Sequence, residues 1–506
     1  MHRDLRRLAD TAHDLLVVGG GIHGACVGWD AALRGLSVAL VERDDFGAAT
    51  SANSLRIVHG GLRYLARGDL PRMWESIRER SVFLRIAPGL VEPLPVLVPT
   101  RGAGPQGRLA LGVALGLNDV LSLNRNRGLD PGRRIPRGRL VSRRECLRLF
   151  PAFEAERPTG GALWFDALMR HPERLTLSFV RAAAGRGAQA ANYVEVERVA
   201  VENGAVKGVR VRDRIGGDSI DIRARAVALA AGPWTEPLAE QAGARRALHS
   251  GPRQALALNL VLGRRLSEVA VGVRARSGPA EDPVCGGHRF LFMAPQGEST
   301  VLGTWYALDD GGDPQATIDY GAEALLGEFN AACPALGLSP ADVVRRQWGR
   351  LPLKAGVEPG RPDALADRPR VVNHGETDGI RGLFSVEGVK YTTARRVAEQ
   401  AVSLICRELR FEDPGCRTTE VRLPDQPTSE GAILQAVREE MAVTLADIVF
   451  RRTDLGAPPG PRRDLVATAA RVAGAELGWD AARQSSEIDE VMRQAQVPGA
   501  AAEVAG

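Results

Sequence analysis

The hydrophobic pattern near the start of the chain predicts a strand, a helix and a second strand in close succession. Residues Asp14 to Val18 are almost all apolar, which is typical of a strand buried on both faces of a sheet. A helical stretch follows from Ala25 to Arg34 and stops at Gly35, a common residue just after a helix end. The apolar run from Leu36 to Val41 is then a second buried strand, which completes a β-α-β unit.

Further along the chain, the pattern predicts both helices and antiparallel strands. Asp69 and Pro71 are start signals for a helix from Leu70 to Ile86. Two runs in which apolar and polar residues alternate lie on either side of Asn203-Gly204. They predict a hairpin formed by residues 193–201 and 206–213. The pattern also indicates sheet through 252–304, a long helix over 392–409, and helices beyond residue 411 that are interrupted by a linker at 456–460.

A glycine-rich motif, GGGIHG, lies directly between the first strand and the first helix. Gly19 permits a tight turn, Gly21 lets the backbone approach a diphosphate, and Gly24 lets the helix pack on the strand. Glu42 ends the second strand, where a carboxylate accepts ribose hydroxyls, and Arg43 follows it at the same edge. The context therefore predicts a dinucleotide site, and the acid disfavours the 2′-phosphate of NADP.

Composition narrows the class of protein. The chain has 506 residues, of which 44% are apolar and 25% are charged, as expected for a globular protein of two or three domains. Its net charge of +5 gives little support for nucleic-acid binding, and its six cysteines have no metal-ligand spacing, so we expect no metal. The charged N-terminus has no secretory h-region, which favours a cytoplasmic protein.

Several segments resemble one known family. They are Ala49–Ser54 (ATSANS), Leu55–Leu65 (LRIVHGGLRYL), Ala231–Trp234 (AGPW), Val301–Thr304 (VLGT), Gly388–Thr393 (GVKYTT) and Val437–Thr453. Together they resemble the FAD-dependent glycerol-3-phosphate dehydrogenase family, within the D-amino-acid-oxidase-like flavoproteins. The resemblance spans roughly residues 14 to 455.

This resemblance implies an α/β (α+β) fold with three parts. They are a Rossmann-like FAD-binding domain, an inserted substrate domain of antiparallel sheet, and a small C-terminal helical domain. The expected boundaries are 12–88, 160–238 and 372–410 for the FAD domain, 89–159 and 239–371 for the substrate domain, and 411–506 for the helical domain.

The resemblance also implies which residues contact FAD, beyond those of the glycine-rich motif. In the family, the Thr/Ser segment lies against the phosphates and flavin, the hairpin lies against the adenine, and the last motif lies near the flavin. The residues carried over on these grounds are Thr50, Ser51, Ser54, His59, Gly60, Val196, Ala231, Gly232, Gly388, Lys390 and Thr392.

The family reaction oxidises the C2 alcohol of glycerol 3-phosphate to the ketone, with hydride transfer to flavin N5 and electrons passed to a quinone or to oxygen. A dianionic phosphate requires forked donors, which arginine supplies. Arg63 is the best candidate, with Tyr64 as a hydroxyl donor beside it. Arg350 resembles a second anion-binding arginine but is displaced by one position. Lys390 is placed to stabilise charge on the reduced flavin, to hold the substrate oxygen, or to act as a base.

The chain differs from the family at the position of the residue that accepts the alcohol proton. Asn259 stands where the family has a histidine, and an amide cannot take up a proton. His288 and His374 are alternative bases from elsewhere in the chain. The sequence is therefore also compatible with a related polyol, a sugar phosphate or another 2-hydroxy compound as the substrate. Two other hypotheses about function also agree with it. One is an amine or amino-acid oxidase in which Arg63 binds a carboxylate, and the other is a flavin-bound module without turnover.

Two features of the basic residues remain. Of 66 basic residues only Lys207, Lys354 and Lys390 are lysine, so a retained lysine marks a candidate site for a compact, titratable amine. The nine-residue apolar run Leu109–Leu117 is too short to span a bilayer, and an arginine-rich segment from Arg125 to Arg148 follows it. The apolar run and the arginine-rich segment together suggest peripheral contact with anionic lipid on the inner face of the cell membrane.

Overall fold

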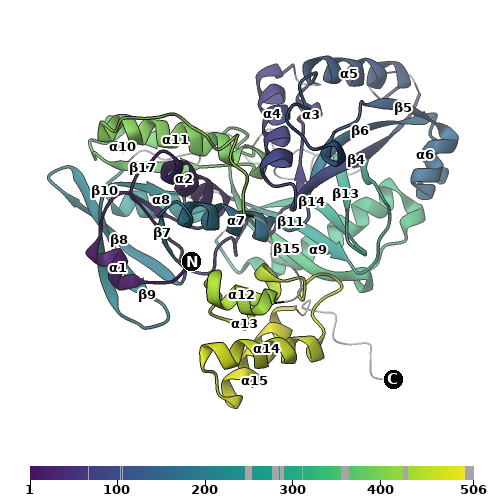
Figure 1. Ribbon diagram of the computed structural model, residues 1–506. Coiled ribbons are helices and arrows are strands. Elements are labelled where there is room, and N and C mark those ends of the chain that lie inside the picture. Colours follow the sequence, from purple (N-terminus) through teal and green to yellow (C-terminus); the bar gives the residue numbers. More distant parts are fainter. Residues whose placement is uncertain are drawn as a thin grey trace.

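The strand–helix–strand unit predicted for the N-terminus is present in the computed structural model (Figure 1). β1 (Ala12–Val18), α2 (Ile22–Leu33) and β2 (Val38–Val41) follow one another directly. The helix begins at Ile22 rather than at the predicted Ala25, because Gly21 is already the extended N-cap residue and Ile22 donates its N–H to Ser51 Oγ at 3.0 Å. The end of the glycine-rich motif is therefore helical.

The structure describes most of the chain. The described residues are 1–65, 68–102, 104, 106–245, 254–275, 284, 290–309, 311–354, 364–424 and 431–495, without the side chain of Arg63.

The first sheet has eight strands and is parallel at its centre. β1 lies between β2 and β10 (Ser219–Leu229), and parallel pairing continues outward to β17 (Leu383–Glu387) and to β7 (Gln189–Ala191). β16 (Arg370–Asn373) adds an antiparallel edge. The predicted hairpin is confirmed as β8 (Val194–Glu202) and β9 (Ala205–Asp213), and β9 pairs with β10.

Both faces of this sheet are buried, as the apolar run in β1 predicts. Leu15 and Val17 face a core shared with α2, α7 (Pro172–Ala184) and α11 (Ala394–Leu409). Leu16 and Val18 face the opposite core, which the β8–β9 hairpin helps to form. The sheet thus has α2, α7 and α11 on one face, and the hairpin with α1 (Leu5–Asp10) and α8 (Thr235–Gln241) on the other (Figure 1).

The second sheet has nine strands and is antiparallel at every pair except β12 with β4. Its order is β15 (Val343–Pro352), β11 (Gln254–Leu262), β14 (Ser299–Asp309), β13 (Phe290–Gln296), β12 (Ala270–Arg274), β4 (Val91–Thr100), β6 (Gly160–Met169) and β3 (Ile57–Val58), and β5 (Arg139–Ser142) pairs with β6. The predicted boundaries count β3 and β6 with the FAD domain, whereas their hydrogen bonds join this sheet. The domain boundaries themselves stay predictions.

Helices cover the second sheet and connect the two sheets. α9 (Pro314–Ala332) packs on the second sheet, and α4 (Leu70–Ile86) has the predicted bounds because Asp69 caps its first turn. The remaining helices before residue 410 are α1 (Leu5–Asp10), α3 (Leu62–Leu65), α5 (Arg108–Leu121), α6 (Arg143–Leu149), α8 (Thr235–Gln241) and α10 (His374–Thr377). Short 3₁₀ turns include η3 (Gly232–Trp234) and η7 (Tyr391–Thr393), and η7 leads into α11.

The C-terminal region forms a small helical unit with its own core, as predicted. It contains α12 (Ala432–Glu439), α13 (Leu445–Asp447), the π-helical turn η8 (Ile448–Arg452), α14 (Arg463–Leu477) and α15 (Ala481–Ala495). Val466, Ala470 and Val491 are among the buried residues of this core.

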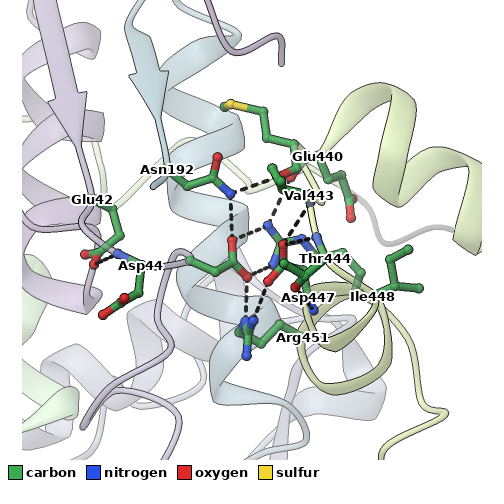
Figure 2. A network of polar contacts seen from close by, with 12 residues as sticks. Glu42, Asp44, Asn192, Glu440, Val443, Thr444, Asp447, Ile448 and Arg451 are labelled. Carbon is green, nitrogen blue, oxygen red and sulfur yellow. Dashed lines mark hydrogen bonds and ion pairs between the residues drawn. The ribbon is translucent and has the colours of Figure 1, made fainter. Parts of the chain in front are cut away.

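A buried charge network joins this helical unit to the loop that follows β2 (Figure 2). Asp45 is fully buried and accepts hydrogen bonds from Arg452 Nη2 at 2.7 Å and from Arg451 Nε at 2.5 Å. Asn192 Nδ2 donates to Asp45 Oδ1 at 3.0 Å and to the carbonyl of Met441 at 2.9 Å. The loop carrying Asp45 is therefore held by Asn192, which follows β7, and by two arginines of the C-terminal helical unit.

The same network continues on either side of Asp45. Arg451 Nη2 donates to Asp447 Oδ1 at 2.5 Å (Figure 2). The hydroxyl of Tyr193 donates to the same oxygen at 2.7 Å. Glu440 is fully buried and pairs with Arg174 at 2.7 Å and Arg181 at 3.2 Å, both on α7. The helical unit is consequently fixed against the loop after β2 and against α7.

We predict that Asp45→Asn destabilises the protein by about 3 kcal/mol, because it leaves the buried Arg452 without its carboxylate and removes one of the two carboxylates that pair with Arg451. Burial alone would raise the pKa of Asp45, but Arg452 and Arg451 outweigh it and hold the pKa well below its usual value. A depressed carboxyl pKa contributes stability above the unfolded value of about 3.9, and this contribution is lost as the pH falls further. Urea unfolding at neutral pH measures the difference.

Asp44→Asn is the matched control for this experiment. Asp44 is the neighbouring residue, and its half-exposed carboxylate pairs with Arg214 and Arg43 at the surface. Its loss costs no more than about 1 kcal/mol. Equal destabilisation by the two variants would contradict the role given to the buried network.

Candidate active site

A cavity of about 510 Å³ opens where the parallel strands of the first sheet end. Val18, Val41 and Val386 line it from the carboxyl ends of β1, β2 and β17. Its opposite wall comes from the second sheet and includes Asn259 and Tyr306. Ligands of open α/β sheets bind at this edge, so the cavity is the candidate site.

The glycine-rich motif shapes the end of the cavity nearest to β1. Gly19 has a φ of +105°, and a Cβ there would lie 2.6 Å from the carbonyl oxygen of Ala230. A Cβ on Gly24 would lie 1.9 Å from the carbonyl oxygen of Gly19, so only glycine lets α2 pack this close. Gly21, Ile22 and His23 line the cavity, and the N-terminus of α2 therefore opens onto it.

Glu42 ties this turn to the loop after β2. Its Oε2 accepts the N–H of Gly20 at 2.6 Å and its Oε1 accepts the N–H of Asp44 at 2.9 Å. Burial raises the pKa of the Glu42 carboxyl, and the two backbone N–H groups oppose that rise. Each oxygen keeps a second lone pair, so the carboxylate can still accept ribose hydroxyls.

The structure brings most of the predicted site residues to this one cavity. The residues on its wall are Gly19, Gly21, Glu42, Arg43, Thr50, Ser51, Ser54, Val196, Ala231, Gly232, Asn259, Arg350, Gly388 and Lys390. Five predicted residues do not line it, namely Gly24, His59, Gly60, Tyr64 and Thr392. The side chain of Arg63 lies outside the described residues. That the wall residues contact a cofactor or substrate stays a prediction.

Gly60 does not line the cavity, but its backbone contacts fix the position of the segment around it. Its N–H donates to Asp166 Oδ1 at 2.5 Å, and the same oxygen accepts from the buried Arg80 at 3.0 Å. A Cβ on Gly60 would lie 2.1 Å from Arg80 Nη1. The backbone of the HGG segment is thus locked to β6 and α4 by a buried ion pair.

Two of the three lysines meet at Asp367. Lys390 Nζ donates to the Asp367 carbonyl at 3.1 Å and lies 4.7 Å from the centre of the Tyr64 ring. Lys354 Nζ lies 3.5 Å from Asp367 Oδ2, which also pairs with Arg72 at 2.8 Å. Burial would raise the pKa of Asp367, but Arg72 and Lys354 lower it overall. Sequence reasoning missed Asp367 and Arg72, which no motif marks.

Asn259 is buried and has both ends of its amide occupied. Its Oδ1 accepts the hydroxyl of Thr304 at 2.8 Å, and its Nδ2 donates to the carbonyl of Asn53 at 3.1 Å. The amide therefore joins β14 to the Thr/Ser segment. Arg350 also has a protein partner, since its Nε donates to Asp309 Oδ2 at 2.5 Å.

Of the two alternative histidines, the structure describes His374, which does not line the cavity. His374 is fully buried on α10, with Nδ1 2.8 Å from Asp378 Oδ2 and Nε2 2.8 Å from Ser385 Oγ. The hypothesis that His374 supplies the base is wrong, because both ring nitrogens are used structurally and the residue does not line the cavity. His288 lies outside the described residues. Sequence reasoning passed over His23, although it is a polar residue inside the glycine-rich motif.

Comparison with known proteins agrees with these observations. The model of the family "FAD dependent oxidoreductase" matches residues 14–399, and that of the "C-terminal domain of alpha-glycerophosphate oxidase" matches residues 392–484. A glycerol-3-phosphate dehydrogenase from Synechocystis sp. is 31% identical over 83% of this chain and 75% of its own. An aerobic glycerol-3-phosphate dehydrogenase from Staphylococcus aureus is 28% identical over 80% and 69%.

A solved structure shows the same fold. The glycerol-3-phosphate dehydrogenase from Bacillus halodurans, complexed with FAD, aligns over 97% of this chain and 95% of its own, with a TM-score of 0.72 and 23% identity. The expected fold class, with its C-terminal helical domain, is therefore confirmed.

The residues of the cavity fit FAD. The N-terminus of α2 offers N–H groups for a diphosphate, and Glu42 offers acceptors for ribose hydroxyls. The chain therefore belongs to the FAD-dependent oxidoreductase family and, within it, to the glycerol-3-phosphate dehydrogenases.

Proposed function

We propose that the protein oxidises the secondary alcohol of glycerol 3-phosphate, or of a similar phosphorylated polyol, to the ketone. The observation that carries the proposal is the continuity of one cavity from the dinucleotide motif to Arg350 and Lys390. The relatives named above are glycerol-3-phosphate dehydrogenases, which favours this substrate class over the amine or amino-acid oxidase and over a module without turnover. A quinone or oxygen is the proposed final electron acceptor.

The charges at the far end of the cavity suit a phosphorylated substrate. Bound FAD supplies the hydride acceptor. Arg350 and Lys390 on the cavity wall, together with the predicted ligand Arg63, provide cations for a dianionic phosphate and for oxygen atoms that gain charge. Asp309 neutralises part of the Arg350 charge and fixes the direction of its guanidinium group.

The surroundings of Lys390 favour two of its three predicted roles. Its donation to the Asp367 carbonyl and its place over the Tyr64 ring hold Nζ in position at the cavity. We propose that Lys390 stabilises negative charge or holds the substrate oxygen from this position.

The substrate class can be tested by anaerobic bleaching of the flavin absorbance. We expect glycerol 3-phosphate to reduce the bound flavin within seconds and glycerol to do so far more slowly, because glycerol has no phosphate for the cationic end of the cavity. Stopped-flow absorbance at the flavin maximum measures both rates. Bleaching by amines or amino acids alone would favour the oxidase alternative, and the absence of bleaching by any donor would favour a module without turnover.

A second prediction concerns Lys390→Arg. A guanidinium group is planar and longer than the compact ammonium that fits between the Tyr64 ring and the Asp367 carbonyl. We expect kcat/KM for glycerol 3-phosphate to fall about tenfold or more. Lys207→Arg is the control, because Lys207 is exposed on β9 and away from the cavity. Near-normal turnover of Lys390→Arg would show that the amine itself is not required.

We also propose peripheral contact between this protein and an anionic membrane surface. No described helix is long and apolar enough to cross a bilayer. α5 instead exposes large apolar side chains at the outer edge of the second-sheet region, with Leu109 83%, Val113 64% and Val120 62% exposed (Figure 1). The exposed arginines that follow it include Arg137 and Arg143, and this combination suits an interfacial helix on anionic lipid.

Co-sedimentation with vesicles tests this surface. We expect the full chain to sediment with vesicles of mixed zwitterionic and anionic lipid, and the double variant Leu109→Glu, Val113→Glu to remain in solution, because two charges on the apolar face oppose insertion. Leu465→Glu on α14 is the control, since it places one charge at another exposed leucine. Undiminished sedimentation of the double variant would contradict α5 as the contact surface.

A further inference from the structure

The C-terminal helical unit contacts both chain segments that form the cavity wall near Glu42, although no described residue of the unit lines the cavity itself. The first segment is the loop 42–48, which follows β2, and the second is the segment 192–197, which leads into β8. The wall residues are Glu42, Arg43, Asp44, Gly47 and Ala48 in the first segment and Val194, Glu195, Val196 and Glu197 in the second.

The loop 42–48 lies around the glycine-rich turn. Glu42 Oε2 accepts the N–H of Gly20 at 2.6 Å, and Gly47 donates its N–H to the Gly20 carbonyl at 3.1 Å. A Cβ on Gly20 would lie 2.6 Å from the ring of Phe46, so the loop also packs directly on the turn. Any displacement of this loop therefore moves the Glu42 carboxylate and the backbone of the turn together.

Asp45 is the residue through which the C-terminal helical unit holds this loop. It is buried, does not line the cavity, and accepts hydrogen bonds from Arg452 Nη2 at 2.7 Å and from Arg451 Nε at 2.5 Å. The preceding residue joins the loop to the second segment, because the carbonyl of Asp44 accepts the N–H of Tyr193 at 2.9 Å. The two wall segments are thus bonded to each other as well.

The second segment has its own contacts with the same unit. The hydroxyl of Tyr193 donates to Asp447 Oδ1 at 2.7 Å. Asn192 Nδ2 donates to the carbonyl of Met441 at 2.9 Å (Figure 2). Tyr193, like Asp45, does not line the cavity and lies behind its wall. Residues 441–452 of the helical unit therefore support both segments from the side that faces away from the cavity.

A different buried ion pair of the helical unit leads away from the cavity. Glu440 pairs with Arg174 at 2.7 Å and with Arg181 at 3.2 Å, both on α7, and no described residue of α7 lines the cavity. Loss of either kind of contact lowers the stability of the folded protein. Only the contacts of Asp45 and Tyr193 act directly on the cavity wall.

We propose that Asp45 and Tyr193 are positioning residues for the nucleotide half of bound FAD, through which the C-terminal helical unit holds the two wall segments in their binding conformation. The glycine-rich turn and Glu42 are suited to this half of the cofactor. A ligand binds more weakly when its binding conformation is populated only part of the time. By linkage, a nucleotide bound at the wall in turn stabilises the contacts of the helical unit. The inference rests on FAD binding in this cavity, as the proposed function does, and its tests use no substrate.

Affinities of the full-length apoprotein for ADP, by calorimetry, and for FAD, by fluorescence quenching, test the inference. We expect Asp45→Asn to raise both Kd values about tenfold, because the loop then leaves its binding conformation for part of the time. Tyr193→Phe keeps the ring and loses only the hydrogen bond to Asp447, so both Kd values should rise about threefold. Glu440→Gln is the matched control, since it removes a buried carboxylate of the same unit and should change both values by less than about twofold.

An unchanged Kd for ADP in Asp45→Asn would overturn the inference. An equal rise in Glu440→Gln would overturn it as well, because destabilisation alone would then account for the weaker binding. These outcomes differ from a failure of the cofactor assignment, in which the unmodified apoprotein binds neither FAD nor ADP and the proposed function falls with the inference.

Hydrogen exchange of the unmodified apoprotein gives a measurement that depends on no variant. We expect ADP to slow amide exchange at residues 441–452 more than in α9, because the bound nucleotide and the contacts of these residues stabilise one another. Equal slowing in the two regions, or none in either, would overturn the inference. Should Asp45→Asn fail to fold, this measurement and the Kd values of Tyr193→Phe decide the matter.

Discussion

The close approach of α2 to the end of β1 is the constraint on which the rest of the site depends. Because Gly24 packs against the backbone of Gly19, the axis of α2 points its N-terminus at the edge of the parallel sheet. Glu42, at the end of the adjacent strand, then reaches the N–H of Gly20. The glycine-rich turn, the N-terminus of α2 and the Glu42 carboxylate therefore have fixed positions relative to one another. The second sheet forms the opposite wall of the cavity.

Features that depend on neighbours in the sequence could be predicted, and features that depend on distant pairs could not. The strand at β1, the turn at Asn203-Gly204 and the helix α4 all follow from local periodicity and from residues that favour turns or caps. The pairing of β6 with β4 and β5 has no such local signal, and the sequence did not predict which sheet this strand joins. Sheet membership is decided by long-range packing.

The residues of the candidate site show the same difference between local features, which could be predicted, and long-range contacts, which could not. The glycine-rich turn, Glu42 and the segment around Lys390 were recognisable because their spacing reflects what a dinucleotide requires. Asp367 and Asp166 act by holding other residues in place, and a single carboxylate with no motif around it cannot be identified from sequence. His374 is the opposite case. Its residue type suggested a catalytic base, but its two ring nitrogens lie at hydrogen-bond distance from Asp378 and Ser385 and hold the fold together.

The scarcity of lysine also has a structural counterpart. Buried ion pairs in this chain use arginine, as in Arg395 with Glu79 and Arg80 with Asp166, where a forked group can bond to several acceptors at once. Lys354 and Lys390 instead meet at Asp367, where a single ammonium contacts one carboxylate or one carbonyl oxygen.

The contact of Asp45 with Arg451 and Arg452 has a consequence for how the protein is made. The residues lie more than 400 positions apart, and a ribosome releases the chain from its N-terminus onward. The loop next to Glu42 therefore leaves the ribosome more than 400 residues before Arg451 and Arg452. Its buried carboxylate has no guanidinium partner until synthesis has passed residue 452, and a chain that stops before these arginines leaves the loop without its ion pairs.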